Sequence, residues 1–203
     1  MRVGILGAGP VGQTLAAKLR ELGHGVTIGT RTPREGAVSY SEAASGAELV
    51  INATGGTASL GALASAGAGN LAGKVLIDVS NALDPSQGMP PRVAVANDDS
   101  IGEQIQHAYP ETRVVKALNT VNTQVMVDPD GVPGDHVLFV AGNDDGAKAQ
   151  VVELLGSFGW PSDRVVDLGD ITGARAMEQY LVLWLRLLAR LGHARFNISL
   201  DQA

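Results

Sequence analysis

The stretch Val3-Gly4-Ile5-Leu6-Gly7-Ala8-Gly9-Pro10-Val11-Gly12 decides how this chain folds. It begins with a short apolar run, which enters a turn rich in glycine. Apolar side chains then recur at helical spacing, at Val11, Leu15, Ala16, Leu19 and Leu22. A second apolar run, residues 26–28, follows this segment. The pattern predicts a strand, a glycine turn, a helix and a second strand, which together make a βαβ unit.

The three glycines of the turn have different tasks in a dinucleotide-binding site. Gly7 allows the tight turn, Gly9 lets a pyrophosphate approach the backbone, and Gly12 lets the helix pack closely on the strand. Pro10 suits the first helical turn, and the free N–H groups of that turn, from Val11 onward, attract phosphate. Glycine-rich turns are common, but the position of this one between strand and helix favours a dinucleotide site over a plain turn.

The end of the second strand predicts which dinucleotide binds. An NAD enzyme usually has an acidic residue about 20 positions past the motif, whereas an NADP enzyme has basic and small polar residues there. Here the sequence is Gly29-Thr30-Arg31-Thr32-Pro33-Arg34, and the first carboxylate is Glu35. Arg31, with Thr30 and Arg34 beside it, is therefore predicted to hold the 2'-phosphate of NADP(H). The alternative is that both arginines are solvated loop residues.

Composition narrows the class of protein. The 203 residues include 15 basic and 21 acidic side chains, and the net charge of -6 argues against nucleic acid or an anionic membrane as a partner. There is no cysteine, which excludes disulfides and thiol chemistry and fits a cytoplasmic protein. The four histidines are scattered, so we predict no metal. We expect no signal peptide, because the apolar run after Met1-Arg2 is too short. We expect no membrane span, because Arg186 and Arg190 interrupt the longest apolar run.

The fold class predicted is α/β: a Rossmann-type, doubly wound, mainly parallel sheet with a small C-terminal α/β appendage. We place the nucleotide domain at residues 1–123 and the appendage at residues 124–203. Further strands are expected at residues 49–54, 74–80 and 112–118, and open α/β sheets bind ligands at the carboxyl ends of their strands. The residues expected at that edge are Thr54, Gly55, Ser80, Asn81 and Asn119.

Each of these edge residues has a functional and a plain interpretation. Thr54 and Gly55 either lie along the cofactor or form an ordinary loop. Ser80 and Asn81 stand at the root of a long loop, residues 81–92, which is a candidate substrate lid, although asparagine is also a common turn former. Asn119 is a candidate to orient the nicotinamide carboxamide or the acceptor ring, since an amide both donates and accepts hydrogen bonds.

The remaining helices are less regular. We expect a short helix at residues 39–47 with Ser41 as its cap, and only partial helix at residues 58–69 because glycine weakens helices. The last helix, residues 171–192, is apolar nearly all round, so it is either buried in the monomer or forms a homodimer contact, which we favour. Its first turn carries Thr172, Gly173, Arg175 and Glu178, which either face the active-site cleft or serve as caps and a solvated charge pair.

Taken together, five segments resemble the NADPH-dependent coenzyme F420 reductase family. They are Gly7-Ala8-Gly9-Pro10-Val11-Gly12, Gly29-Thr30-Arg31, Lys116-Ala117-Leu118-Asn119-Thr120, Gly142-Asn143-Asp144-Asp145 and Arg175-Ala176-Met177-Glu178. The resemblance implies a Rossmann domain with a small C-terminal domain, a homodimer, and direct hydride exchange between NADPH and the deazaflavin F420. It also implies that Arg31 and Thr30 contact the 2'-phosphate and that Asn119 lies beside the nicotinamide.

The function predicted is therefore an NADP(H)-dependent oxidoreductase acting on a small-molecule hydride acceptor, with F420 as the first choice. In such a transfer the protein orients the cofactors and excludes water, and no dedicated acid or base is required. Two alternatives stay open. One keeps NADPH but changes the acceptor to an imine, a flavin, a quinone or a metal chelate, and the other is a non-catalytic module that senses NADPH.

Overall fold

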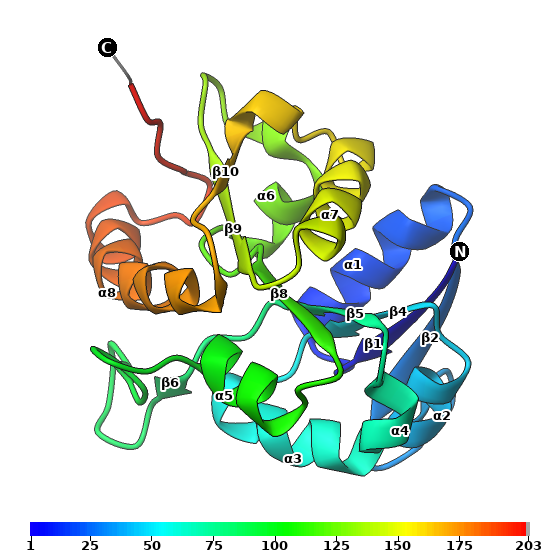
Figure 1. Ribbon diagram of the computed structural model, residues 1–203. Coiled ribbons are helices and arrows are strands. Elements are labelled where there is room, and N and C mark those ends of the chain that lie inside the picture. Colours follow the sequence, from blue (N-terminus) through cyan, green and yellow to red (C-terminus); the bar gives the residue numbers. More distant parts are fainter. Residues whose placement is uncertain (202–203) are drawn as a thin grey trace.

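One eight-stranded sheet runs through the computed structural model of the protein, which describes residues 1–201 (Figure 1). The strand order is β10-β9-β8-β5-β4-β1-β2-β3, and neighbours are parallel except for β8 and β9. The strands are β1 (Arg2–Leu6), β2 (Gly25–Thr30), β3 (Val38–Ser39), β4 (Leu49–Asn52), β5 (Val75–Asp78), β8 (Arg113–Ala117), β9 (Leu138–Gly142) and β10 (Val165–Asp167). The predicted α/β fold with a mainly parallel, Rossmann-like sheet is confirmed.

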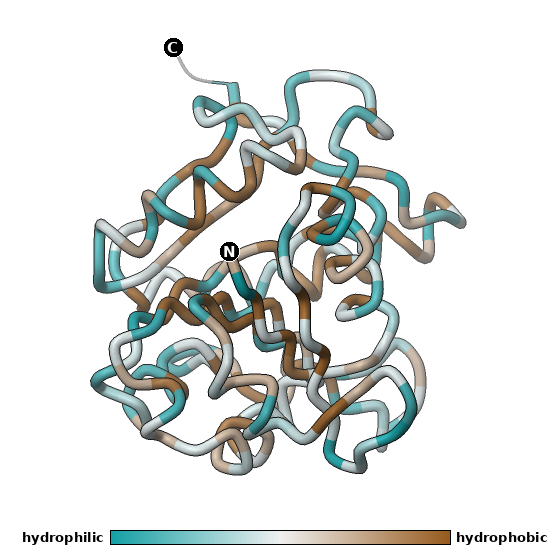
Figure 2. The backbone as a smooth tube through the Cα atoms, turned by 90° about the vertical axis from the view of Figure 1, so that its right-hand side faces the viewer, coloured by the Kyte–Doolittle hydropathy of each residue, from teal (hydrophilic) through white to brown (hydrophobic). Residues whose placement is uncertain are grey.

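Helices cover both faces of the sheet. One layer contains α1 (Pro10–Glu21), α6 (Thr123–Val127) and α7 (Asp145–Ser157), and the other contains α2 (Tyr40–Ser45), α3 (Gly56–Ala66), α4 (Ala68–Leu71) and α5 (Ile101–Ala108) (Figure 1). Because both faces are covered, β4 and β5 are buried at every position. The strongly hydrophobic stretches accordingly gather in the middle of the molecule (Figure 2). The last helix, α8 (Ala174–Leu191), follows the 3₁₀ turn Ile171–Gly173 and lies beside the sheet (Figure 1).

The C-terminal part of the chain requires a correction to the predicted organisation. Strands β9 and β10 do not form a separate sheet: β9 pairs with β8, and β10 extends the sheet beyond β9. The larger hydrophobic core is also continuous from Val3 to Trp160. The expected appendage therefore shares the sheet and core of the nucleotide-binding part. The boundary at 123/124 separates two parts of the sequence that fold around one core.

Three local predictions also change. The cap of α2 is Ser39 rather than Ser41: its hydroxyl accepts a hydrogen bond from the Glu42 backbone N–H, and the Glu42 side chain accepts one from the Ser39 N–H. The alanine- and glycine-rich segment is more helical than expected, because α3 is continuous from Gly56 and α4 follows it. The loop at 81–92 forms a short antiparallel pair, β6 (Leu83–Asp84) with β7 (Arg92–Val93).

A fully buried ion cluster joins the sheet to the last helix. Lys116 on β8 donates hydrogen bonds to Asp78 Oδ2 on β5 (2.7 Å) and to the Ser80 carbonyl (2.6 Å). It also pairs with Glu178 Oε1 on α8 at 2.8 Å, and all three side chains are at most 1% exposed. The two oxygens of Glu178 in turn accept the backbone N–H groups of Ile101 and Gly102, the first turn of α5. This cluster fixes four elements, β5, β8, α5 and α8, relative to one another.

The charges of this cluster are compensated by the ion pairs within it rather than by hydration. Burial alone lowers the pKa of Lys116, but the two carboxylates outweigh it and raise the pKa above its ordinary value of 10.5. A raised lysine pKa in the folded state stabilises the protein fully below pH 10.5, and this contribution is lost as the pH rises through the folded-state pKa.

Replacing Lys116 with methionine is expected to destabilise the protein by about 3 to 5 kcal/mol, because two carboxylates would remain buried without a cation. Urea unfolding monitored by circular dichroism measures the loss. The matched control is Arg164→Ala, which removes a partly exposed pair with Asp135 and is expected to cost less than about 1 kcal/mol. Equal losses in the two variants would show that the buried cluster does not hold the fold.

Candidate dinucleotide and acceptor site

The three glycines of the turn after β1 have the geometry that their predicted tasks require. Gly7 has φ +120°, and a side chain there would collide with the Ala53 backbone on the neighbouring strand end. At Gly12 a Cβ would overlap the Gly7 carbonyl oxygen, so helix α1 can sit this close to β1 only with glycine. Gly9 differs: its backbone is extended and no atom lies within 4 Å of an added Cβ. The open side of the turn is therefore at Gly9.

Helix α1 begins here without a side-chain cap. Gly9 is the N-cap residue and Pro10 occupies the first helical position. The first intrahelical bond runs from the Gln13 N–H to the Gly9 carbonyl at 3.0 Å. The N–H groups of Val11 and Gly12 precede that bond, at the positive end of the helix dipole. An anion fits against this end of the helix.

A groove of about 570 Å³ opens beside this turn, between the carboxyl ends of β1 and β4. These two strands are neighbours whose connections run in opposite directions along the sheet, which is the place where doubly wound folds bind nucleotides. The residues lining the groove are Gly7, Gly9, Arg31, Tyr40, Ala53, Thr54, Gly55, Ala58, Gly61, Ala62 and Ser65. The groove thus brings together five residues that were predicted for the cofactor site: Gly7, Gly9, Arg31, Thr54 and Gly55.

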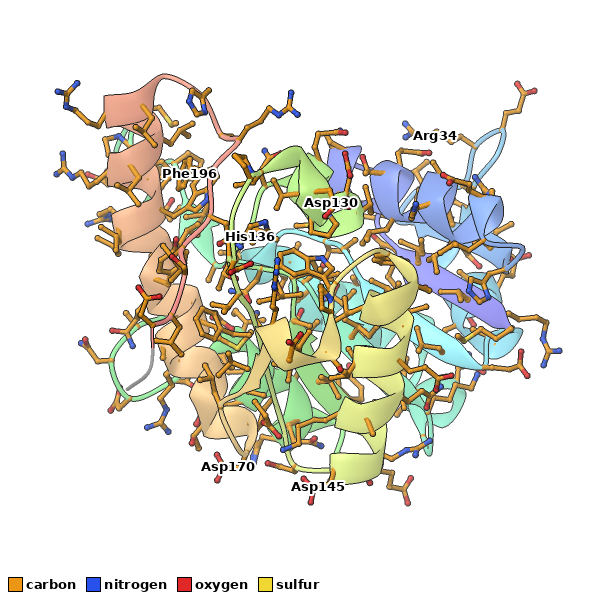
Figure 3. The ribbon with its side chains drawn as sticks, turned by 90° about the horizontal axis from the view of Figure 1, so that it is seen from above. Arg34, Asp130, His136, Asp145, Asp170 and Phe196 are labelled. Carbon is orange, nitrogen blue, oxygen red and sulfur yellow. The ribbon has the colours of Figure 1, made fainter. Side chains whose placement is uncertain are left out.

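Arg31 and Arg34 occupy different positions at the end of β2. Arg31 is exposed and lines the groove. Arg34 does not line it; its backbone forms a bridge with Ala37, and Figure 3 shows Arg34 at the outer edge of the molecule. The Thr30 hydroxyl donates to the Thr32 carbonyl at 2.7 Å, so it shapes the loop that carries Arg31. The geometry favours Arg31 as the residue that meets a phosphate.

A second pocket of about 270 Å³, which we call the inner pocket, adjoins the groove, since both are lined by Ala53 and Thr54. Among the described residues, those that line it carry no charge. They are Val11, Ala53, Thr54, Val79, Ser80, Asn81, Leu83, Asn119, Val121, Asn122, Thr123, Met126, Leu181 and Trp184. Groove and inner pocket together form a path with an arginine at one end and a neutral, partly apolar chamber at the other.

Asn119 is fixed in the wall of the inner pocket. Its side-chain nitrogen donates to Asn81 Oδ1 and to the backbone carbonyl of Met177, both at 3.0 Å. The side-chain nitrogen of Asn81 donates in turn to the backbone carbonyl of Asn119 at 2.9 Å. Both donor hydrogens of Asn119 are thus used within the protein. Its Oδ1 is buried and has no partner among residues 1–201, and the same holds for Ser80 Oγ. Asn119 can therefore offer a ligand only an acceptor.

The first turn of α8 does not face the pocket. Arg175 makes a bidentate pair with Glu103 at 2.8 and 2.5 Å. Thr172 is bound to Asp170, which caps this turn. Glu178 belongs to the buried cluster with Lys116, so it is neither a solvated residue nor part of the cleft. The plain interpretation of this turn holds for Arg175 and Thr172. The residues of α8 that do line the pocket are Leu181 and Trp184, one and two turns further on.

Comparison with known proteins places this geometry in a family. Residues 2–82 match the family described as NADP oxidoreductase, coenzyme F420-dependent. A crystal structure from Arthrobacter sp. FB24, named as a candidate F420-dependent NADP reductase, is 49% identical, with a TM-score of 0.95 and 100% of both chains covered. The chain belongs to this family of NADP-dependent oxidoreductases.

Two curated proteins match this chain more weakly. The F420-dependent NADP reductase of Methanocaldococcus jannaschii is 30% identical over 118 residues, which are 58% of this chain and 52% of that protein. Metalloreductase STEAP3 of Rattus norvegicus is 29% identical over 195 residues, which are 92% of this chain and 37% of that protein. The chain spans about half or less of the length of these curated relatives.

The residues present fit NADP(H), the cofactor of the family. Gly9 leaves room beside the free N–H groups of Val11 and Gly12, Arg31 supplies a cation at the rim, and Asn119 presents a buried acceptor that lacks a partner. Within residues 1–201 no cluster of His, Asp or Glu side chains is placed to bind a metal ion. No helix in the same range is long and apolar enough to cross a bilayer.

Sequence reasoning offered the first turn of α8 as part of the cleft but missed Leu181 and Trp184, the residues of α8 that line the pocket. Leu181 and Trp184 come from a segment that we had assigned to an appendage and an interface. The spacing of Met177, Leu181 and Trp184 marks one helical face, but spacing cannot tell which surface that face covers. Met126, on α6, reaches the same pocket and was likewise not predicted.

Replacing Gly9 with valine is expected to abolish binding of both NADPH and NADH, because the side chain would occupy the open space beside the first turn of α1. The free energy of unfolding in urea is expected to change by less than about 0.5 kcal/mol, since no protein atom lies within 4 Å of a Cβ added at Gly9. Calorimetric titration with each coenzyme measures the binding. The control is Gly69→Ala, which is equally open and away from the groove. Normal affinity in the Gly9 variant would place the dinucleotide elsewhere.

Proposed function

We propose that this protein transfers hydride between NADPH and the deazaflavin coenzyme F420. The observation that carries the proposal is the continuous path from Arg31, past the open side of Gly9, to the neutral chamber at Asn119. The first part suits a phosphorylated dinucleotide, and the second suits uncharged rings. The relative in Methanocaldococcus jannaschii carries the name F420-dependent NADP reductase, which supports the same acceptor.

Each residue of the path has a task in this proposal. The N–H groups of Val11 and Gly12 hold the pyrophosphate, and Arg31 holds the 2'-phosphate through a charge-assisted contact. Thr54 and Gly55 line the passage between groove and pocket. Bound NADPH supplies the hydride, which is two electrons with one hydrogen nucleus, and becomes NADP⁺.

The inner pocket orients the reacting rings and keeps water away. Asn119 Oδ1 accepts a hydrogen bond from the nicotinamide carboxamide, an orientation fixed by the bonds of its amide nitrogen to Asn81 and Met177. Ser80 lines the same pocket, and its hydroxyl has no partner among the described residues. Apolar side chains, among them Val79, Leu83 and Leu181, exclude water from the chamber. No dedicated acid or base is needed, because a hydride moves directly between the two rings.

Replacing Arg31 with alanine is expected to weaken NADPH binding by about 1.5 to 3 kcal/mol, the range for a charge-assisted hydrogen bond, and to leave NADH nearly unchanged. Titration calorimetry with both coenzymes provides the measurement. Arg34→Ala is the matched control, because Arg34 lies on the same loop but outside the groove. Equal losses for NADPH and NADH in the Arg31 variant would show that Arg31 does not read the phosphate.

Stopped-flow absorbance identifies the acceptor. The NADPH complex is expected to lose its absorbance at a single rate when oxidised F420 is added. If F420 leaves NADPH untouched but an imine, a flavin, a quinone or a metal chelate oxidises it, the acceptor belongs to that second class. The similarity to a rat metalloreductase, a protein named for metal reduction, is the observation that keeps the chelate in this comparison. Binding of NADPH without oxidation by any acceptor would favour a sensing module.

We also propose that the protein is a homodimer whose contact includes α8. Beyond the face that packs on the sheet, this helix exposes Val182, Leu183 and Leu191 by 57%, 53% and 48%. Apolar side chains of this number on one helix favour a partner surface. Sedimentation velocity would support the proposal with a species of twice the 20.9 kDa chain mass, and a monomer at micromolar concentration would oppose it. The cytoplasmic location expected from the absence of cysteine stays a prediction.

A further inference from the structure

A buried amide is bonded to Thr54, which lines both the groove and the inner pocket. This amide belongs to Asn52, the last residue of β4, which lies opposite Asp78 in the parallel pairing of β4 with β5. Its side-chain nitrogen donates to Asp78 Oδ1 at 2.8 Å and to Ser59 Oγ at 2.9 Å. Its Oδ1 accepts from the Thr54 N–H at 3.3 Å and from the Thr54 hydroxyl at 2.7 Å. Both hydrogens and both lone pairs of the amide are thus used inside the protein, so Asn52 itself has nothing to offer a ligand.

The partners of Asn52 allow one orientation of its amide. The carboxylate of Asp78 can only accept hydrogen bonds, so the amide nitrogen must lie on that side. The backbone N–H of Thr54 can only donate, so the amide oxygen must lie on the other side. That oxygen carries no hydrogen, and the 2.7 Å bond to it therefore uses the one hydrogen of the Thr54 hydroxyl. Thr54 Oγ1 is left with its lone pairs alone.

One of these lone pairs is available to a ligand. A hydroxyl oxygen has two lone pairs, and Ser59 Oγ, 3.1 Å away, is its other partner among the described residues. Ser59 has a single hydrogen, which goes either to this oxygen or to the Gly55 carbonyl at 3.3 Å. Thr54 is half-buried rather than buried, and it lines both cavities. A ligand group that meets its hydroxyl must therefore be a donor, which excludes the oxygens of phosphates and carbonyls as partners.

The place of Thr54 along the path indicates which part of the cofactor supplies this donor. NADP(H) is built in the order adenosine, pyrophosphate, ribose and nicotinamide. Arg31 lies at the adenosine end of the path, and the first turn of α1 at Gly9 meets the pyrophosphate. Asn119 lies at the other end, in the inner pocket. Thr54 lines both cavities and so comes between pyrophosphate and nicotinamide, where the second ribose belongs. The hydroxyls of that ribose are donors.

We infer that Asn52 is a positioning residue, which fixes the Thr54 hydroxyl as an acceptor for a hydroxyl of the nicotinamide ribose. Thr54 touches the sugar, and Asn52 acts through Thr54. The inference deepens the proposed function and rests on it, because it uses the direction in which the cofactor lies along the path. A sugar held at this point places the attached nicotinamide in the inner pocket.

The acceptor is anchored to the most rigid part of the molecule. Asp78, which binds the Asn52 amide, also accepts from Lys116 at 2.7 Å and from the Ser80 N–H at 3.2 Å. Lys116 in turn pairs with Glu178 on α8. The same buried carboxylate thus supports Thr54 at the entrance of the inner pocket and the helix that forms one of its walls. A group that is held in its binding geometry loses little freedom when the ligand arrives.

The first test removes the acceptor. Thr54→Val replaces the hydroxyl with a methyl group, whereas Thr54→Ser keeps the hydroxyl. Calorimetric titrations use NADP⁺, 2'-phospho-ADP-ribose, which keeps the second ribose but lacks nicotinamide, and adenosine 2',5'-bisphosphate, which lacks both. Thr54→Val is expected to bind the first two about five-fold more weakly, the effect of one neutral hydrogen bond, and the bisphosphate within about two-fold of the original protein. Thr54→Ser is expected to restore the affinity for all three.

The second test determines whether Asn52 acts through Thr54. Asn52→Leu removes the amide at similar side-chain volume and is expected to weaken NADP⁺ binding about five-fold, with the bisphosphate again within about two-fold. In the double variant, Asn52→Leu with Thr54→Val, the loss is expected to stay at about five-fold, whereas independent effects would multiply to about 25-fold. If Asn52→Leu fails to fold, the two Thr54 variants still decide whether the sugar is bound here.

The matched control is Thr57→Val. Thr57 lies in the first turn of α3, three residues from Thr54, is exposed, and lines neither the groove nor the inner pocket. Its affinity for each of the three probes is expected to stay within about two-fold of the original protein.

Three results would overturn the inference. They are unchanged NADP⁺ affinity in Thr54→Val, equal losses for NADP⁺ and the bisphosphate in that variant, and multiplying losses in the double variant. Each of them can occur in a protein that reduces F420, so they do not refute the proposed function. Conversely, a protein that shows the expected binding pattern but passes no hydride to F420 refutes the proposed acceptor and leaves the role of Asn52 standing.

Discussion

The buried contact between Lys116, Asp78 and Glu178 is the constraint on which the arrangement of the site depends. Three charges without water are unfavourable unless each is paired, so the side chains from β8, β5 and α8 must meet at one point. Glu178 extends this requirement to α5 by accepting the N–H groups at its start. Close packing acts in the same direction, since a Cβ at Gly102 of α5 would lie 2.9 Å from Ala174 of α8. The long helix is thereby held at the carboxyl edge of the sheet.

That placement turns a nucleotide-binding sheet into a two-part site. The groove needs only the first half of the chain, because Gly7, Gly12 and Arg31 belong to the first βαβ unit and Thr54 follows β4. The inner pocket needs the second half too. Its walls come from the ends of β5 and β8, from α6 and from α8. The groove is thus built from local structure, whereas the inner pocket forms only when segments from both halves of the chain come together.

The polar groups of the inner pocket are likewise positioned by residues from other segments of the chain. Asn119 is tied to Asn81 and Met177, and these bonds determine that its oxygen, and not its nitrogen, is left for a ligand. Trp184 gains its orientation from Phe196, twelve residues later in the chain. Unpaired buried atoms are a cost to the folded protein, and three of the five found within residues 1–201 belong to side chains that line the inner pocket.

The sequence by itself determined the α/β fold, the strand–turn–helix at Gly7 to Gly12, and the residues that stand at the carboxyl edge of the sheet. These features are local: a glycine turn, a run of buried apolar residues and a strand end are all visible within a few positions. It placed the C-terminal strands in an appendage and the cap of α2 at Ser41, because short strands and neighbouring serines give no signal about their partners. Only the tertiary structure decided that β9 and β10 extend the same sheet, that Glu178 is buried with Lys116, and that Leu181 and Trp184 line the inner pocket. Each of these depends on contacts between residues far apart in the chain, and such contacts are selected by the packing of the whole core rather than by any local pattern.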